Sequence, residues 1–360
     1  MKIIIIGGGI TGLYIGYMLN RYNIDFDIYE RSSKIGGKLL NKKIFDKKIE
    51  YQIYPHHTHM INLLKELNIN YKLDQKPISM INFYKKLFEK IKHIFDKYPI
   101  QNISVNDFAK KHLTNDEYMK FISYIADRKL DQMEISDYIK YNHDNLLKMN
   151  QSKYIININN ELIEKLYLNI HNNVYVGHNV QQISYMPITN NYILTINDKF
   201  INADKIIMTS NMNIRLIIPN IIKSQFAKIE SFNQLRIYYQ YANDKDILSL
   251  DYICKDDDLL YESIIKNKKS TIKLLNAFLQ SKYKISKYAY LDWKSAFHIN
   301  KFKIKTDFYN KYGIILAIHP YANSLEGSCI CAKKTFDIVQ NNIYSKRSEF
   351  LYNIKIFKLN

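Results

Sequence analysis

The stretch Lys2-Ile3-Ile4-Ile5-Ile6-Gly7-Gly8-Gly9-Ile10-Thr11-Gly12 decides the fold of this chain of 360 residues. Its four consecutive isoleucines predict a central parallel strand, because such strands are buried on both faces and read as continuous apolar runs. The run leads directly into Gly7-x-Gly9-x-x-Gly12, and seven of the chain's ten glycines lie within the first 37 residues. Glycine is favoured where backbone approaches backbone or a ligand, so this turn is predicted to hold phosphate groups.

The residues that follow predict a strand–helix–strand unit. Apolar side chains recur at helical spacing after Gly12, and Gly16 would let that helix lie close to the sheet. A second strand is predicted over Asp25–Tyr29, and Glu30 ends it eighteen residues after Gly12. An acidic side chain at about this spacing reaches the adenosine ribose of a bound dinucleotide.

Three glycines of this turn have predicted roles. Gly7 allows the tight turn, Gly9 removes the Cβ that would block a pyrophosphate, and Gly12 permits contact between helix and strand. The start of the helix, at Ile10 and Thr11, offers backbone N–H groups and a positive dipole end to the phosphates.

The chain is strongly basic, with 52 Lys+Arg against 34 Asp+Glu and a net charge of +18. Nucleic acid or an anionic membrane is one interpretation of such a charge. However, the basic residues are spread out, and the abundant Lys, Asn, Ile and Tyr have A/T-rich codons. We therefore attribute the charge to an A/T-rich genome, such as that of a parasite or a large DNA virus, and expect no nucleic-acid partner.

Cysteine usage and hydropathy indicate an intracellular, cytoplasmic chain. The three cysteines, Cys254, Cys329 and Cys331, provide no disulfide framework. Apart from residues 3–19, which three consecutive glycines interrupt, no segment is apolar enough to suggest a membrane span or a signal-peptide core.

Further along the chain the periodicity changes. Residues 60–150 read as mostly helical, with Ser104 as a cap for one helix. From about Asn173 the pattern is typical of strands. The predicted strands lie at Val174–Val176, Val180–Ile183, Tyr192–Ile196, Lys205–Met208, Leu235–Tyr241 and Ile314–Ala317.

The segment after the second strand, Glu30-Arg31-Ser32-Ser33-Lys34-Ile35-Gly36-Gly37-Lys38, resembles that of the flavin-containing amine oxidase superfamily. In that superfamily the ribose-binding acid is followed by Arg/Lys-x-Gly-Gly. The resemblance implies bound FAD, with Glu30 on the adenosine ribose. It also implies that this segment lines the cofactor, through Arg31, Lys34, Gly36, Gly37 and Lys38.

Two later segments extend the resemblance. Residues 179–208 are similar to the inner strands of the superfamily, which implies that Val180 contacts the adenine. Residues 313–328 are similar to the returning motif that caps the flavin, which implies contacts from His319 and Leu325. Ala317-Ile318-His319 departs from that motif, because it lacks the glycine and the acid that meets the ribityl chain. No motif for covalent flavin attachment is recognisable, so the resemblance implies noncovalent FAD.

Three residues are candidates for catalysis. The histidine-rich loop at His56 and His57 falls where the superfamily passes near the flavin ring, and a histidine-rich surface turn is the alternative. Arg236 falls where amine oxidases place a lysine near flavin N5, and an arginine on a sheet face is the alternative. We predict no metal site, because no cysteine or carboxylate completes a ligand set at suitable spacing.

The resemblance implies a Rossmann-like α/β FAD-binding domain with an inserted α+β substrate domain. The predicted FAD-binding parts are 1–58, 169–215 and 289–345, the substrate parts are 59–168 and 216–288, and the tail is 346–360. The implied activity is hydride transfer from a substrate C–H, beside an amine, to flavin N5, with reoxidation by O2 or another acceptor. The alternatives are a mutase-like or desaturase-like flavin enzyme and a catalytically degenerate FAD-binding protein.

Overall fold

The computed structural model describes most of the chain. The described residues are 1–39, 43–44, 47–48, 51–53, 57–75, 81–100, 102–115, 117–118, 121, 134–139, 154–158, 161–209, 214–218, 220, 229–241, 248–254, 285–300, 312–317 and 325–357.

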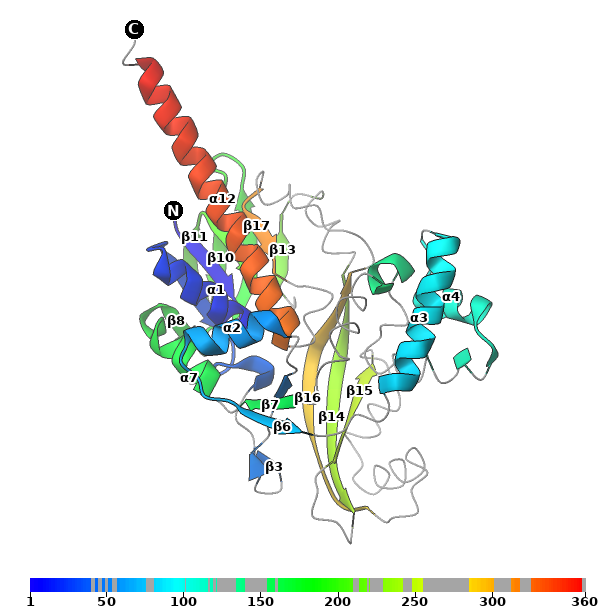
Figure 1. Ribbon diagram of the computed structural model, residues 1–360. Helices are drawn as coiled ribbons and strands as arrows, with labels where there is room; N and C mark the ends of the chain where they lie inside the picture. Colours follow the sequence, from blue (N-terminus) through cyan, green and yellow to red (C-terminus); the bar gives the residue numbers. More distant parts are fainter. Residues whose placement is uncertain are drawn as a thin grey trace.

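A five-stranded parallel sheet forms the centre of the part that holds the glycine turn (Figure 1). Its strand order is β17-β12-β1-β2-β8, so distant parts of the chain pair side by side. The strands are β1 (Ile3–Ile6), β2 (Phe26–Glu30), β8 (Val174–Val176), β12 (Lys205–Met208) and β17 (Ile314–Leu316). The glycine turn at the end of the central strand β1 therefore lies at the C-terminal edge of this sheet, where such folds bind ligands.

The isoleucine run of β1 is buried on both faces, as predicted. Ile3 and Ile5 pack into the cluster that contains helix α1 (Ile10–Arg21), whereas Ile4 and Ile6 pack into a second cluster on the opposite face. This alternation follows from the two-residue period of a strand. The long C-terminal helix α12 (Leu325–Phe357) and α7 (Glu161–Leu168) pack on α1.

A second sheet, of order β11-β10-β9-β13, covers the other face of the parallel sheet; β13 pairs with β9 in parallel, and the other neighbours pair antiparallel. Its strands are β9 (Val180–Met186), β10 (Asn191–Ile196), β11 (Lys199–Ala203) and β13 (Arg215–Ile217). Tyr192 of β10 is fully buried, and its hydroxyl donates a 2.6 Å hydrogen bond to the carbonyl of Tyr312, just before β17. The second sheet is thereby joined to the edge of the parallel one.

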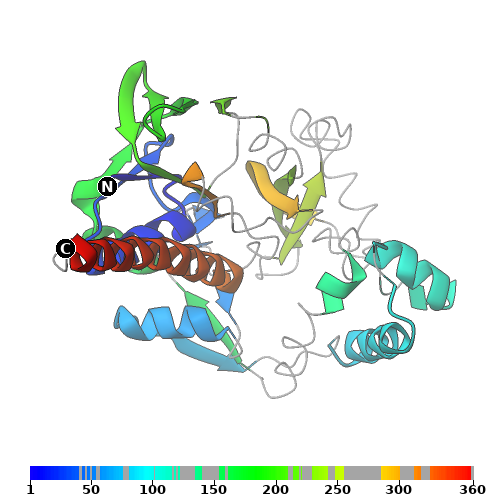
Figure 2. The same cartoon turned by 90° about the horizontal axis from the view of Figure 1, so that it is seen from above.

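A third sheet and a pair of helices lie away from the parallel sheet (Figure 1). Long strands β14 (Ile229–Tyr241) and β16 (Ile285–Asn300) pair with β15 (Leu248–Cys254), and Figure 2 shows this sheet beside the cofactor-side elements. Helices α3 (Ile81–Lys97) and α4 (Val105–His112) lie beyond it and share a core of their own. The smaller elements are α2 (Thr58–Glu66), β5 (Tyr51–Ile53), β6 (Lys72–Gln75), β7 (Tyr154–Ile158), β3 (Lys43–Ile44) and β4 (Lys47–Lys48), with short 3-10 turns η1 (Gly37–Leu39) and η4 (His171–Asn173).

The predicted α/β fold is confirmed, and several of its elements lie where the sequence pattern predicts them. Strand β12 and β8 have the predicted bounds, and Ser104 caps α4 by accepting a 3.0 Å hydrogen bond from the Asp107 N–H. The domain boundaries stay predictions. Within the described residues, no helix combines the length and the apolar character needed to cross a membrane.

Candidate cofactor-binding site

The glycine turn is closed tightly on itself. Gly7 has a φ of 113°, a conformation that favours glycine, and its N–H donates to the Tyr29 carbonyl at 2.9 Å. A Cβ on Gly12 would lie 2.0 Å from the Gly7 carbonyl oxygen, so only glycine fits there. The Thr209 hydroxyl donates to the carbonyls of Ile6 (2.9 Å) and Gly7 (3.1 Å). The turn is therefore held by the helix, by β2 and by the end of β12.

The space beside Gly9 is open, in contrast to that beside Gly12. A Cβ on Gly9 would meet no protein atom within 4 Å. Gly9 is also the N-cap of α1, and it supplies no side-chain cap. The first N–H groups of a helix have no acceptor within that helix, and they carry its positive dipole end. Gly9 and the first turn of α1, with Ile10 and Thr11, thus form an open, electropositive cradle that fits a pyrophosphate.

Glu30 ends β2 with a buried carboxylate that closes one side of this cradle. Its Oε2 accepts a 2.7 Å hydrogen bond from the Gly8 N–H, and its Oε1 accepts from the Ser32 N–H at 2.8 Å and from the Ser32 hydroxyl. Glu30 as a whole is only 9% exposed. These bonds fix both carboxylate oxygens beside the turn, where they can accept from ribose hydroxyls.

Gly36 and Gly37 bring the next segment back onto the turn. The Gly36 N–H donates to the Gly8 carbonyl at 2.8 Å, and Gly36 forms a parallel bridge with Gly9. Both glycines have positive φ, 109° and 55°. Arg31 and Lys34 are exposed in the preceding loop, and Lys38 is half-buried in η1. The backbone of Gly36 and Gly37 therefore lines the cradle. The cationic residues Arg31, Lys34 and Lys38 belong to the same segment.

The structure also connects Val180 to this site through the chain before it. The His178 N–H donates to the Glu30 carbonyl at 2.9 Å, and the Gly177 N–H donates to the Ser32 carbonyl at 2.8 Å. Val180 begins β9 two residues later and is buried. The segment predicted to meet the adenine therefore crosses the end of β2, next to the ribose-binding candidate.

The C-terminal helix meets the histidine-rich loop. Leu325 begins α12 and packs against the core cluster of α1. The next residue, Glu326, is buried, and its carboxylate accepts hydrogen bonds from the backbone N–H groups of His59 (3.0 Å) and Met60 (2.8 Å). His57 is the N-cap residue of α2 and is half-buried. Glu326 thus fixes the N-terminus of α2 against that of α12.

The catalytic candidates are described only in part. His56 and the cofactor candidate His319 lie outside the described residues. Arg236 lies in β14, opposite Asp251 of β15 and Leu291 of β16 in register. In the described part of the chain, no three His, Cys, Asp or Glu side chains come together as a metal site.

Together these features define a Rossmann-type dinucleotide-binding site. Residues 5–67 match the family described as the NAD(P)-binding Rossmann-like domain. The sequence comparison with curated proteins found no match.

Solved structures extend the likeness to nearly the whole chain. It is similar to a putrescine oxidase redesigned in its cofactor binding, with 11% identity, a TM-score of 0.70, and coverage of 94% of this chain and 99% of that one. Cyclohexylamine oxidase from Brevibacterium oxydans gives 11% identity, a TM-score of 0.70, and coverage of 95% and 99%. An oxidoreductase from Methanosarcina mazei has 13% identity and a TM-score of 0.64, and the match covers 94% of this chain and 100% of that one. The chain therefore has the fold of these three proteins.

Sequence reasoning missed three residues that shape the site: Ser32, Thr209 and Glu326. Ser32 could have been found, because a serine two residues after a carboxylate can bond to it locally. Thr209 directly follows a predicted strand, and its bond to Gly7 depends on the parallel pairing of β12 with β1. Glu326 reaches its partners across more than 260 residues of sequence, and no local pattern reports that contact.

Proposed function

We propose that this chain is an FAD-dependent oxidoreductase that oxidises a small amine. The observation that carries the proposal is the assembled cradle of Gly9, the uncapped start of α1 and the buried Glu30 carboxylate. The cradle suits any dinucleotide. The choice of FAD is supported by the Lys34-x-Gly36-Gly37 motif and by the fold, which is that of putrescine and cyclohexylamine oxidases.

In this proposal the chain binds FAD noncovalently and orients it. The first turn of α1 holds the pyrophosphate, and Glu30 accepts hydrogen bonds from the adenosine ribose. Val180 contacts the adenine, and the Gly36–Gly37 backbone together with the start of α12 at Leu325 faces the rest of the cofactor. The bound flavin supplies a hydride acceptor for the substrate C–H bond.

The remaining predicted residues would act on the substrate side. We propose that His56, His57 and Arg236 lie near the reacting end of the cofactor, and that 59–168 and 216–288 form the substrate domain. Their part would be to position the amine and to exclude water. His57 is at the start of α2, which Glu326 of α12 holds in place, and this contact supports the proposal for that loop.

The test begins with the purified protein. It should bind FAD, show absorbance near 450 nm, and lose that absorbance anaerobically when putrescine or cyclohexylamine is added. Arg236→Gln should keep the flavin and slow the bleaching by about tenfold or more, as expected when a reacting group is misplaced. Arg215→Gln, on the exposed strand β13, is the matched control and should bleach at the wild-type rate.

The other outcomes separate the alternatives. A protein that cannot be loaded with FAD contradicts the proposal as a whole. Bound flavin that only dithionite reduces would indicate a catalytically degenerate protein. The same behaviour together with sugar-nucleotide binding would indicate a mutase.

A further inference from the structure

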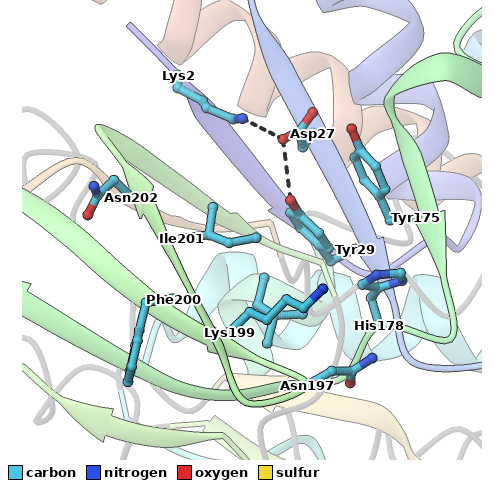
Figure 3. Close-up of a pocket in the computed structure, with 11 residues that line it drawn as sticks. Lys2, Asp27, Tyr29, Tyr175, His178, Asn197, Lys199, Phe200, Ile201 and Asn202 are labelled. Atoms are coloured by element: carbon cyan, nitrogen blue, oxygen red, sulfur yellow. Dashed lines mark hydrogen bonds and ion pairs between the residues drawn. The ribbon is translucent and has the colours of Figure 1, made fainter.

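A second pocket lies on the opposite side of the parallel sheet from α1, between that sheet and the β10–β11 hairpin (Figure 3). Its volume is about 550 Å³, which is within the range of small-molecule sites. The lining includes Tyr29 of β2, Tyr175 of β8 and Phe200 of β11. None of the glycines of the cofactor cradle lines it, and neither does the Glu30 side chain.

One wall of this pocket is aromatic. The rings of Tyr29 and Tyr175 are stacked, with centroids 5.0 Å apart and an interplanar angle of 16°. His178 lies edge-on to Tyr175 at 5.8 Å. Tyr29 is buried, but Tyr175 is 37% exposed. An aromatic face left in solvent beside a pocket is suited to stacking on a planar ligand.

Of the two lysines that line the pocket, Lys2 forms an ion pair and Lys199 does not. Lys2 Nζ pairs with the buried Asp27 carboxylate at 2.7 Å, and the Tyr29 hydroxyl also donates to Asp27 at 3.4 Å. In the described part of the chain, the Lys199 ammonium has no hydrogen-bond or ion-pair partner. Figure 3 shows its side chain directed toward Tyr29 and His178. The pocket therefore offers a free positive charge beside its aromatic wall.

Polar groups beside the aromatic wall of the pocket can orient a ligand. His178 Nδ1 donates to the Val176 carbonyl at 2.8 Å, which leaves Nε2 for another partner. A pocket with a few polar groups set among aromatic ones has the composition of a specific small-molecule site.

We propose that this pocket binds a planar aromatic anion, a ring that carries a phosphate or a carboxylate. The ring stacks against the exposed Tyr175, and the anionic group pairs with Lys199. The site is separate from the cofactor cradle, so it does not depend on the proposed activity. It would bind its ligand whether or not the protein carries FAD.

The test uses 1-naphthyl phosphate as the probe, with 1-naphthol and inorganic phosphate as its two halves, measured by isothermal titration calorimetry with the full chain. The complete probe should bind with a Kd below about 1 mM, at least about tenfold more tightly than either half. Lys199→Gln and Tyr175→Ser should each weaken it by about tenfold, because one removes the charge and the other the stacking face. Titration with 1-naphthoate shows whether a carboxylate replaces the phosphate.

Two exposed positions outside the pocket lining provide matched controls. Lys65→Gln removes an exposed lysine on α2, and Ile188→Ser removes a side chain that is 97% exposed; neither should change the affinity. Excess FAD should not displace the probe. Displacement by FAD, equal losses in the control variants, or no binding at millimolar concentration would each overturn the proposal.

Discussion

Two glycines of the cofactor turn have opposite surroundings, and this contrast yields a prediction at the scale of single residues. A Cβ on Gly9 meets no protein atom, whereas one on Gly12 would lie 2.0 Å from the Gly7 carbonyl. Gly9→Ala should therefore leave the free energy of unfolding within about 1 kcal/mol of wild type, since the backbone at Gly9 is already extended. It should weaken FAD binding at least about tenfold, because the methyl group occupies the space proposed for the pyrophosphate.

Gly12→Ala is the counterpart of that variant. The methyl group would force the helix away from β1, and we expect a loss of about 3 kcal/mol or more in urea unfolding, as for an overpacked interior. Flavin fluorescence titration and urea unfolding, run on both variants, separate the two effects. Equal destabilisation by the two substitutions would contradict the geometry described for the turn.

At the scale of elements, one carboxylate of α12 caps the first turn of α2, in addition to the apolar packing between the two helices. Glu326 accepts the N–H groups of His59 and Met60 in the first turn of α2, and it is buried. Glu326→Ala should cost about 2 kcal/mol of stability, because it removes a cap and leaves two helix N–H groups unpaired. Urea unfolding measures this loss.

The control for Glu326 is Glu164→Ala, in the first turn of α7. Glu164 is exposed, so the substitution should change stability by only a few tenths of a kcal/mol. Glu326→Gln should fall between wild type and Glu326→Ala, since the amide keeps one acceptor oxygen. A Glu326→Ala protein as stable as wild type would show that water caps α2 equally well.

Elements of the first 37 residues could be predicted because their signals are local. The isoleucine run, the helical spacing after Gly12 and the acid at Glu30 each report on neighbours within one strand–helix–strand unit. Strands β16 and β7 have no such signal. Trp293 of β16 pairs with Gln234, and β7 lies between β5 and β6 in its sheet, so each pairing joins segments distant in sequence. Such pairings depend on tertiary packing more than on local propensity.

In the candidate site, too, the local features could be predicted and the contacts between distant segments could not. The residues that form the cradle were predictable from spacing, because one turn contains most of them. The contacts that support the cradle were not, because Thr209 and Glu326 come from elements that only the parallel sheet and the C-terminal helix bring near it. A dinucleotide site could therefore be predicted from the first strand, helix and turn, whereas its fixation by the rest of the chain could not.

At the scale of the whole molecule, buried phenols predict sensitivity to alkali. Burial raises the pKa of Tyr14 to about 12, and it raises the pKa values of Tyr29 and Tyr192 further. Unfolded tyrosines ionise near pH 10, so above that pH the unfolded chain binds fewer protons than the folded one. The free energy of unfolding should therefore be at its full value below about pH 10 and fall as the pH rises toward 12.

Urea unfolding from pH 8 to 12 measures the slope of the free energy of unfolding against pH. Tyr14→Phe should make this slope shallower by up to about one proton per molecule. The exposed Tyr98→Phe should leave the slope unchanged, and equal slopes in wild type and Tyr14→Phe would show that Tyr14 ionises as readily in the folded protein as in the unfolded chain.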